Sequence, residues 1–110
     1  MADSPEDASP EELLVVLRGI GASLFLTDRR LILARDGARR RPRTGMQAWT
    51  LDAIRHIRIE LGRAPSGRIA VWTTGEQEAL SVFFDAPSLD RAQKLLDVAR
   101  PLIARSRRGR

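Results

Sequence analysis

The chain has 110 residues, a formal net charge of +5, one histidine and no cysteine. This length suits one domain that buries a core without help from a metal or a disulfide. The composition excludes a disulfide framework, a thiolate metal site and a cluster of histidine ligands.

Three charged segments flank or interrupt the apolar part of the chain. Residues 1–12 are acidic, residues 29–43 hold seven arginines and one aspartate, and residues 105–110 hold four arginines. We expect a disordered acidic arm over 1–10, a domain over 11–104 and a basic tail over 105–110. The polar N-terminus is unlike a signal peptide, and no apolar run approaches the roughly 20 residues that span a membrane. We therefore expect a cytoplasmic protein.

The first apolar run, Leu13–Arg18, has the length of a buried strand. The preceding residues 9–12 (SPEE) resemble a helix start, which leaves a helix as the alternative. Gly19 and Gly21 stop the run at once and favour a strand followed by a turn.

A hairpin is predicted next, with strands Ala22–Thr27 and Arg30–Arg35. Its joint contains Thr27, Asp28, Arg29 and Arg30. We expect Asp28 to accept hydrogen bonds from backbone amides of the turn, and Thr27 to do the same more weakly. Arg30 should reach a carboxylate or a free carbonyl.

After the hairpin, an arginine-rich loop leads into further strands. The predicted strands are Gln47–Leu51, Ile54–Leu61, Arg68–Thr73 and Ala79–Asp85. In the second of these, the alternation places Ile57, Ile59 and Leu61 inward and His56, Arg58 and Glu60 outward.

From Ala86 the apolar period changes to steps of three and four, which predicts an amphipathic helix. Its stripe consists of Leu89, Ala92, Leu95, Leu96, Ala99, Leu102 and Ile103. Ser88 or Asp85 can cap its start. Pro101 should kink the helix or end it near Arg100, and the continued stripe favours a kink.

Several segments carry a family resemblance in their order and spacing. They are residues 12–14 (ELL), 24–31 (LFLTDRRL), 51–54 (LDAI) and the pair Phe83-Phe84. Over about residues 11–104 the chain resembles the short bacterial PH-like and GRAM-like domains of the pleckstrin-homology superfold. The resemblance implies an α+β, mainly β fold: a PH-like barrel of about seven antiparallel strands, capped by one C-terminal amphipathic helix.

Catalysis is not expected, because the required groups are missing. There is no cysteine, and His56 lies on the outer face of a predicted strand without an obvious carboxylate partner. The glycines are isolated turn residues and form no phosphate-binding loop. We expect no enzyme activity, no cofactor and no metal.

Binding functions remain, and protein–protein interaction or self-association is the one we expect. PH-like folds bind peptides along a sheet edge or a helix groove. The alternative is peripheral binding to anionic lipid or other phosphate groups, and a second alternative is weak nucleic-acid binding. The candidate anion-binding residues are Arg18, Arg39, Arg40, Arg41 and Arg43. The alternative for these arginines is that they are solvated surface. The acidic arm is either disordered or folds back on the Arg39–Arg43 loop and masks it.

Overall fold

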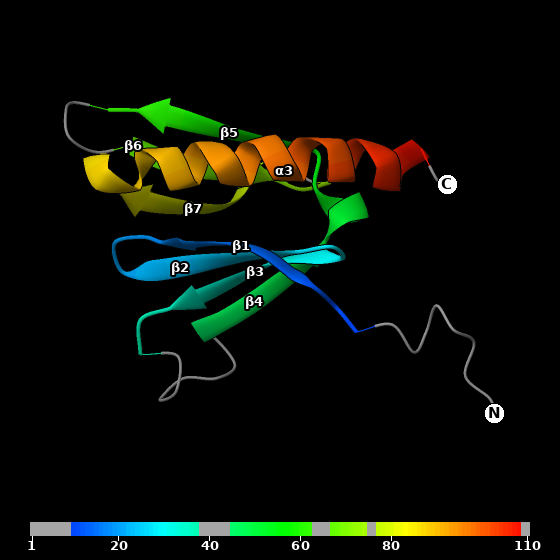
Figure 1. Cartoon of the computed structure of the whole chain (residues 1–110), viewed down its shortest axis with the longest axis horizontal. Helices are drawn as coiled ribbons and strands as arrows, with labels where there is room; N and C mark the ends of the chain where they lie inside the picture. Colours follow the sequence, from blue (N-terminus) through cyan, green and yellow to red (C-terminus); the bar gives the residue numbers. More distant parts are fainter. Residues whose placement is uncertain (1–9, 38–44, 63–66, 75–76, 109–110) are drawn as a thin grey trace.

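The computed structural model describes residues 10–37, 45–62, 67–74 and 77–108. The fold is α+β and mainly β, with seven strands in two antiparallel sheets and one long C-terminal helix (Figure 1). The predicted fold class is confirmed at this level.

Each sheet is built from strands that follow one another in the sequence. Sheet A has the order β1 (Leu13–Arg18), β2 (Ala22–Thr27), β3 (Arg30–Arg35) and β4 (Met46–Thr50). Sheet B has the order β5 (His56–Leu61), β6 (Gly67–Trp72) and β7 (Glu78–Phe84). The 3-10 helix η1 (Leu51–Ala53) links the sheets, and η2 (Ala86–Ser88) precedes the helix α3 (Leu89–Arg108).

The predicted strands are present with small shifts at their ends. Both hairpin strands have the predicted limits, and the run Leu13–Arg18 is a strand, not a helix. The strand predicted over Gln47–Leu51 ends one residue earlier, because Leu51 belongs to η1. The backbone carbonyl of Leu51 accepts the N–H of Ile54 at 3.2 Å, which closes the turn of η1.

The core lies between the inner faces of the two sheets and α3. The helix contacts β1, η1 and β5, and its predicted stripe faces inward. The largest fully buried side chains are Phe84, Leu17, Leu24, Leu26, Leu31, Leu33, Ile54, Ile69, Leu95, Val71 and Val82. Each contributes about 1.5–3 kcal/mol through burial. Leu61, predicted to face inward, is 70% exposed because it is the last residue of an edge strand.

The joint of the hairpin corrects the predicted turn chemistry. The Oγ1 atom of Thr27 accepts the backbone N–H groups of Arg29 at 3.1 Å and Arg30 at 2.9 Å. The carboxylate of Asp28 instead accepts the N–H of Glu12 at 3.0 Å, from the segment before β1. Thr27 is therefore the residue that closes the turn, and Asp28 ties the turn to the start of the domain. Arg30 reaches a carboxylate, as predicted, namely that of Glu11.

The sheets meet where β1 turns into β2. The N–H of Ile20 donates to the carbonyl of Phe83 at 2.7 Å, which forms a β-bridge between the sheets. A Cβ atom on the neighbouring Gly19 would lie 2.6 Å from that carbonyl oxygen. The close approach of β7 therefore requires glycine at this position.

The helix α3 continues through Pro101 to Arg108. It does not end near Arg100, and Ile103 lies buried beyond the proline. The helix also runs past the predicted boundary at residue 104. Within the part of the chain that the structure describes, no helix has the length and apolarity needed to cross a membrane.

Candidate interaction surfaces

The structure places one of the five predicted anion-binding residues. Arg39, Arg40, Arg41 and Arg43 lie outside the described residues, as does most of the acidic arm. Arg18 is the exposed last residue of β1. It lines a groove that also contains Arg91, which the sequence did not single out.

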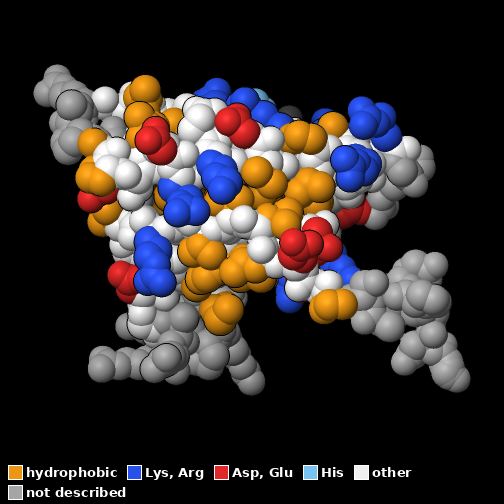
Figure 2. All heavy atoms as spheres, in the orientation of Figure 1, with side chains coloured by type: hydrophobic (Ala, Val, Ile, Leu, Met, Phe, Trp, Pro, Cys, Tyr) orange, Lys and Arg blue, Asp and Glu red, His pale blue; other side chains and the backbone are white. Residues whose placement is uncertain are grey.

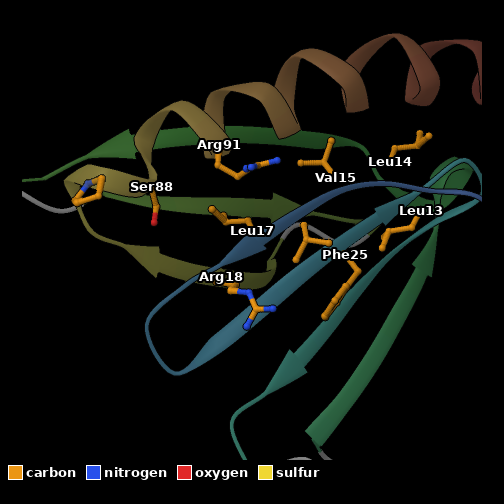
Figure 3. Close-up of a pocket in the computed structure, with 10 residues that line it drawn as sticks. Leu13, Leu14, Val15, Leu17, Arg18, Phe25, Ser88 and Arg91 are labelled. Carbon is orange, nitrogen blue, oxygen red and sulfur yellow. The ribbon is translucent and has the colours of Figure 1, made fainter.

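This groove follows the free edge of β1, between that strand and the start of α3 (Figure 3). Its volume is about 710 Å³. The lining residues are Leu13, Leu14, Val15, Val16, Leu17, Arg18, Phe25, Pro87, Ser88 and Arg91. In Figure 3 Arg91 extends from the helix toward Val15, while Arg18 lies on the other side of the groove. The β1–α3 groove thus combines apolar side chains and the edge of β1 with cations from two elements.

The positive charges of Arg18 and Arg91 are not balanced by any negative charge in the lining of the β1–α3 groove. No carboxylate lines it, and no ion pair joins Arg18 or Arg91 to another described residue. Arg91 is the third residue of α3. A cation in the first turn opposes the helix dipole, which favours carboxylates there. Helix stability therefore does not explain Arg91.

An apolar row continues from this groove across the outer face of sheet A. The pairings Val16 with Phe25, Phe25 with Ile32 and Ile32 with Ala48 put four side chains in one line. We call Val16, Phe25, Ile32 and Ala48 the apolar row. These residues are half-buried or exposed, and their sequence neighbours Leu17, Leu24 and Leu33 fill the core. Figure 2 shows hydrophobic side chains over β1 and β2, with Lys and Arg side chains at one end.

Sheet B carries the opposite kind of outer face. Glu60 forms ion pairs with Arg58 and Arg68, and Arg68 also pairs with Glu78 at 2.9 Å. Hydrogen bonding by Arg68, and then by Arg58, lowers the pKa of the Glu60 carboxyl. The guanidinium of Arg58 lies 4.8 Å from the ring centroid of Trp72. An antiparallel sheet that faces solvent usually has such a polar surface. The outer face of sheet A lacks such a polar surface along the apolar row.

The apolar row has a signal in the sequence. Residues 13–17 (LLVVL), 24–26 (LFL) and 31–34 (LILA) are apolar without alternation. Such runs are typical of strands covered on both faces. With one helix predicted for the whole chain, only one face of sheet A could be covered from within.

A second basic site lies between β5 and the C-terminal half of α3. Arg55, Arg100 and Arg107 line a pocket of about 200 Å³, and no carboxylate is among its lining residues. The Nη2 atom of Arg100 donates to the carbonyl of Ile57 at 3.4 Å. This β5–α3 pocket brings together arginines far apart in the sequence, so no local motif announces it.

The described residues offer no arrangement for metal chemistry. No three His, Asp or Glu side chains among them gather in a way that could hold a metal ion. His56 contacts the ring of Trp72 at a centroid distance of 5.4 Å. Comparisons with models of known protein families, with curated proteins and with solved structures found no match.

Proposed function

We propose that this protein is a non-catalytic interaction module of the PH-like type, acting in the cytoplasm, that binds a partner protein in the β1–α3 groove. The order of four strands, three strands and a C-terminal helix supports the PH-like resemblance. The observation that carries the proposal is that the apolar outer face of sheet A adjoins the β1–α3 groove, which Arg18 and Arg91 line. A ligand that fits both features is an extended segment with apolar side chains and carboxylates.

The free edge of β1 gives such a segment a way to bind. An edge strand has unpaired backbone groups, and an added strand binds them while its side chains fill neighbouring pockets. Apolar side chains of the segment would pack on Val16 and Phe25. Its carboxylates would bind Arg18 and Arg91, each exposed ion pair contributing up to about 1 kcal/mol.

Display of random twelve-residue peptides on phage tests this proposal. We expect the wild-type protein to enrich peptides with alternating apolar residues and at least one Asp or Glu. The double charge reversal Arg18→Glu/Arg91→Glu should weaken the selected peptides at least tenfold, because it replaces two attractions of about 1 kcal/mol with repulsions. The matched control is Arg105→Glu/Arg108→Glu, at exposed positions near the end of α3 and outside the groove, which should bind like the wild type. Equal loss in both variants, or none in the first, would contradict the proposal.

Binding to an anionic membrane surface is the second candidate function. The β5–α3 pocket supports it, because Arg55, Arg100 and Arg107 converge there without a carboxylate. The sequence adds the four arginines of residues 39–43 as a separate candidate. Each basic residue near an anionic surface contributes about 1 kcal/mol.

Co-sedimentation with vesicles decides whether and where such binding occurs. Vesicles containing phosphatidylserine should sediment the protein, and vesicles of phosphatidylcholine alone should not. Loss of sedimentation in Arg55→Ala/Arg107→Ala assigns binding to the β5–α3 pocket. Loss in a variant with Arg39, Arg40, Arg41 and Arg43 replaced by alanine assigns it to the loop. Equal sedimentation with both vesicle types removes this candidate, and retention of short duplex DNA instead would favour nucleic acid.

A further inference from the structure

The strand β4 is an edge strand without the features that usually protect an edge. It pairs with β3 on one side, and no described strand pairs with its other side. Its five residues, MQAWT, include no charge, proline or glycine, and four of them are exposed. Its pairing with β3 runs regularly from Arg30–Thr50 to Ala34–Met46 without a bulge. Natural edge strands are normally interrupted by charges, prolines or bulges, which prevent pairing with another chain.

None of the other described edges is as regular, uncharged and open as that of β4. The pairing of β1 with β2 is irregular between Leu13 and Val15, and α3 packs against β1. The edge strand β5 carries His56, Arg58 and Glu60 on its outer face and also contacts α3. The edge of β7 is bridged by Ile20. In Figure 1 β4 forms the margin of sheet A on the side away from α3.

We propose that β4 pairs with β4 of a second copy of this chain across a two-fold axis, so that the two A sheets join into one. The apolar row ends at Ala48 on this open edge. With the axis at Ala48, the row continues directly into the Ala48, Ile32, Phe25 and Val16 of the other copy. The partner that extends the row in register is thus the chain itself, and an isologous contact of this kind closes as a dimer.

The antiparallel register follows from that axis. Ala48 lies opposite Ala48 of the second copy, Met46 opposite Thr50, and Gln47 opposite Trp49. The two strands bring no charges face to face, although the whole chain carries +5. Arg35 follows Ala34, the β3 residue that pairs with Met46, and Asp52 lies two residues after Thr50. The two-fold therefore brings the Arg35 end of each copy beside the Asp52 end of the other, so that the ends are complementary in charge.

Single cysteines test this register directly, because the natural chain has none. Directly opposed residues of antiparallel strands have Cα atoms about 4.5–5.5 Å apart, which is within the range of a disulfide. We expect Ala48→Cys to form a disulfide-linked dimer under mild oxidation. Gln47→Cys should remain largely unlinked, because its opposite residue is Trp49. Equal linking of both variants, or of neither, would overturn the proposed pairing.

Light scattering after size exclusion tests the contact without a covalent bond. The wild-type chain should change from monomer to dimer as its concentration rises. Ala48→Lys places two like charges at the axis and should weaken the dimer at least tenfold. Gln77→Lys adds the same charge at an exposed position outside sheet A and should dimerise like the wild type. Thermal unfolding shows that both variants are folded. A wild-type chain that is monomeric at every concentration, or a dimer unaffected by Ala48→Lys, would overturn the inference.

The contact at β4 does not depend on the β1–α3 groove, which lies at the opposite edge of sheet A. Arg18→Glu/Arg91→Glu should therefore leave the dimer intact while it weakens peptide binding. Ala48→Lys should have the reverse effect.

Discussion

The carboxylate of Glu11 and the guanidinium of Arg30 form a two-point ion pair. The Nε atom of Arg30 lies 2.9 Å from Oε2 of Glu11, and Nη2 lies 3.0 Å from Oε1. The hydroxyl of Thr27 donates to the same carboxylate. These bonds hold the segment before β1 against the β2–β3 hairpin. Hydrogen bonding by Arg30, and then by Thr27, lowers the pKa of the Glu11 carboxyl.

This ion pair makes the stability of the domain depend on pH. A carboxyl whose pKa is lower in the folded state stabilises the fold fully above its unfolded pKa, and the contribution is lost as the pH falls through the folded pKa. Glu11→Gln should therefore be less stable than the wild type at pH 7. The difference should shrink below about pH 4, near the unfolded pKa of glutamate, and vanish below the lowered folded pKa.

Urea unfolding at a series of pH values measures this difference. The matched control is Glu12→Gln, one residue away. Glu12 bonds to Asp28 through its backbone N–H, which the substitution leaves in place. This control should follow the wild-type pH dependence. A gap between Glu11→Gln and the wild type that stays constant from pH 7 to pH 3 would show that the carboxylate charge is not its cause.

Thr27 offers a test of the turn itself. This residue is 5% exposed, and its Oγ1 atom accepts two backbone N–H groups. Thr27→Val keeps the shape but removes the acceptor, so we expect a loss of about 1–3 kcal/mol in the free energy of unfolding. Thr27→Ser keeps the hydroxyl and should lose less. A larger loss in Thr27→Ser than in Thr27→Val would mean that packing of the methyl group matters more than the hydrogen bonds.

The sequence predicted the elements of this fold because their signals are local. The hairpin limits follow from polar residues between apolar runs, and the inner face of α3 follows from its period. The predicted role of Asp28 was wrong because the group that bonds to its carboxylate, the N–H of Glu12, is 16 residues away. A turn residue's side chain can bond either within the turn or across to another segment, and the sequence does not distinguish these.

The candidate surfaces were predicted less well, since they depend on tertiary neighbours. Arg18 was identified as a cation beside a loop, but its companion Arg91 comes from the start of α3. The open edge of β4 depends on the strand order of sheet A, which fixes which strand is last. The uncharged composition of this strand is visible in the sequence, yet it has meaning only once the strand is known to be an edge.

Gly19 and Gly21 both punctuate the chain, but the structure gives them different reasons. A side chain on Gly19 would meet the carbonyl oxygens of Phe83 and Ala22, at 2.6 and 2.9 Å. Gly21 has open space around it and a φ of 80°. We expect Gly19→Ala to cost 2 kcal/mol or more, roughly, because backbone must move apart, and Gly21→Ala to cost about 1 kcal/mol for the left-handed conformation.

Chemical denaturation of both glycine variants gives this ranking. The slope of the unfolding free energy against urea should stay unchanged in Gly21→Ala. In Gly19→Ala the slope should change, because the junction of the two sheets is disturbed. A larger loss in Gly21→Ala than in Gly19→Ala would mean that the bridge between Ile20 and Phe83 adapts easily, and that the contact between the sheets there is soft.

Pro101 provides a test in the stabilising direction. It lies at an exposed position inside α3. Because proline has no backbone N–H, the carbonyl of Asp97 receives no hydrogen bond from residue 101. Proline costs about 3 kcal/mol relative to alanine inside a helix, while its restriction of the unfolded chain returns up to about 1 kcal/mol. Pro101→Ala should therefore raise the free energy of unfolding by about 2 kcal/mol. Ser106→Ala, in the same helix, should change it by about 0.5 kcal/mol or less. If Pro101→Ala lowers the stability, the proline ring shapes the helix so that Ile103 reaches the core, and that packing outweighs the missing hydrogen bond.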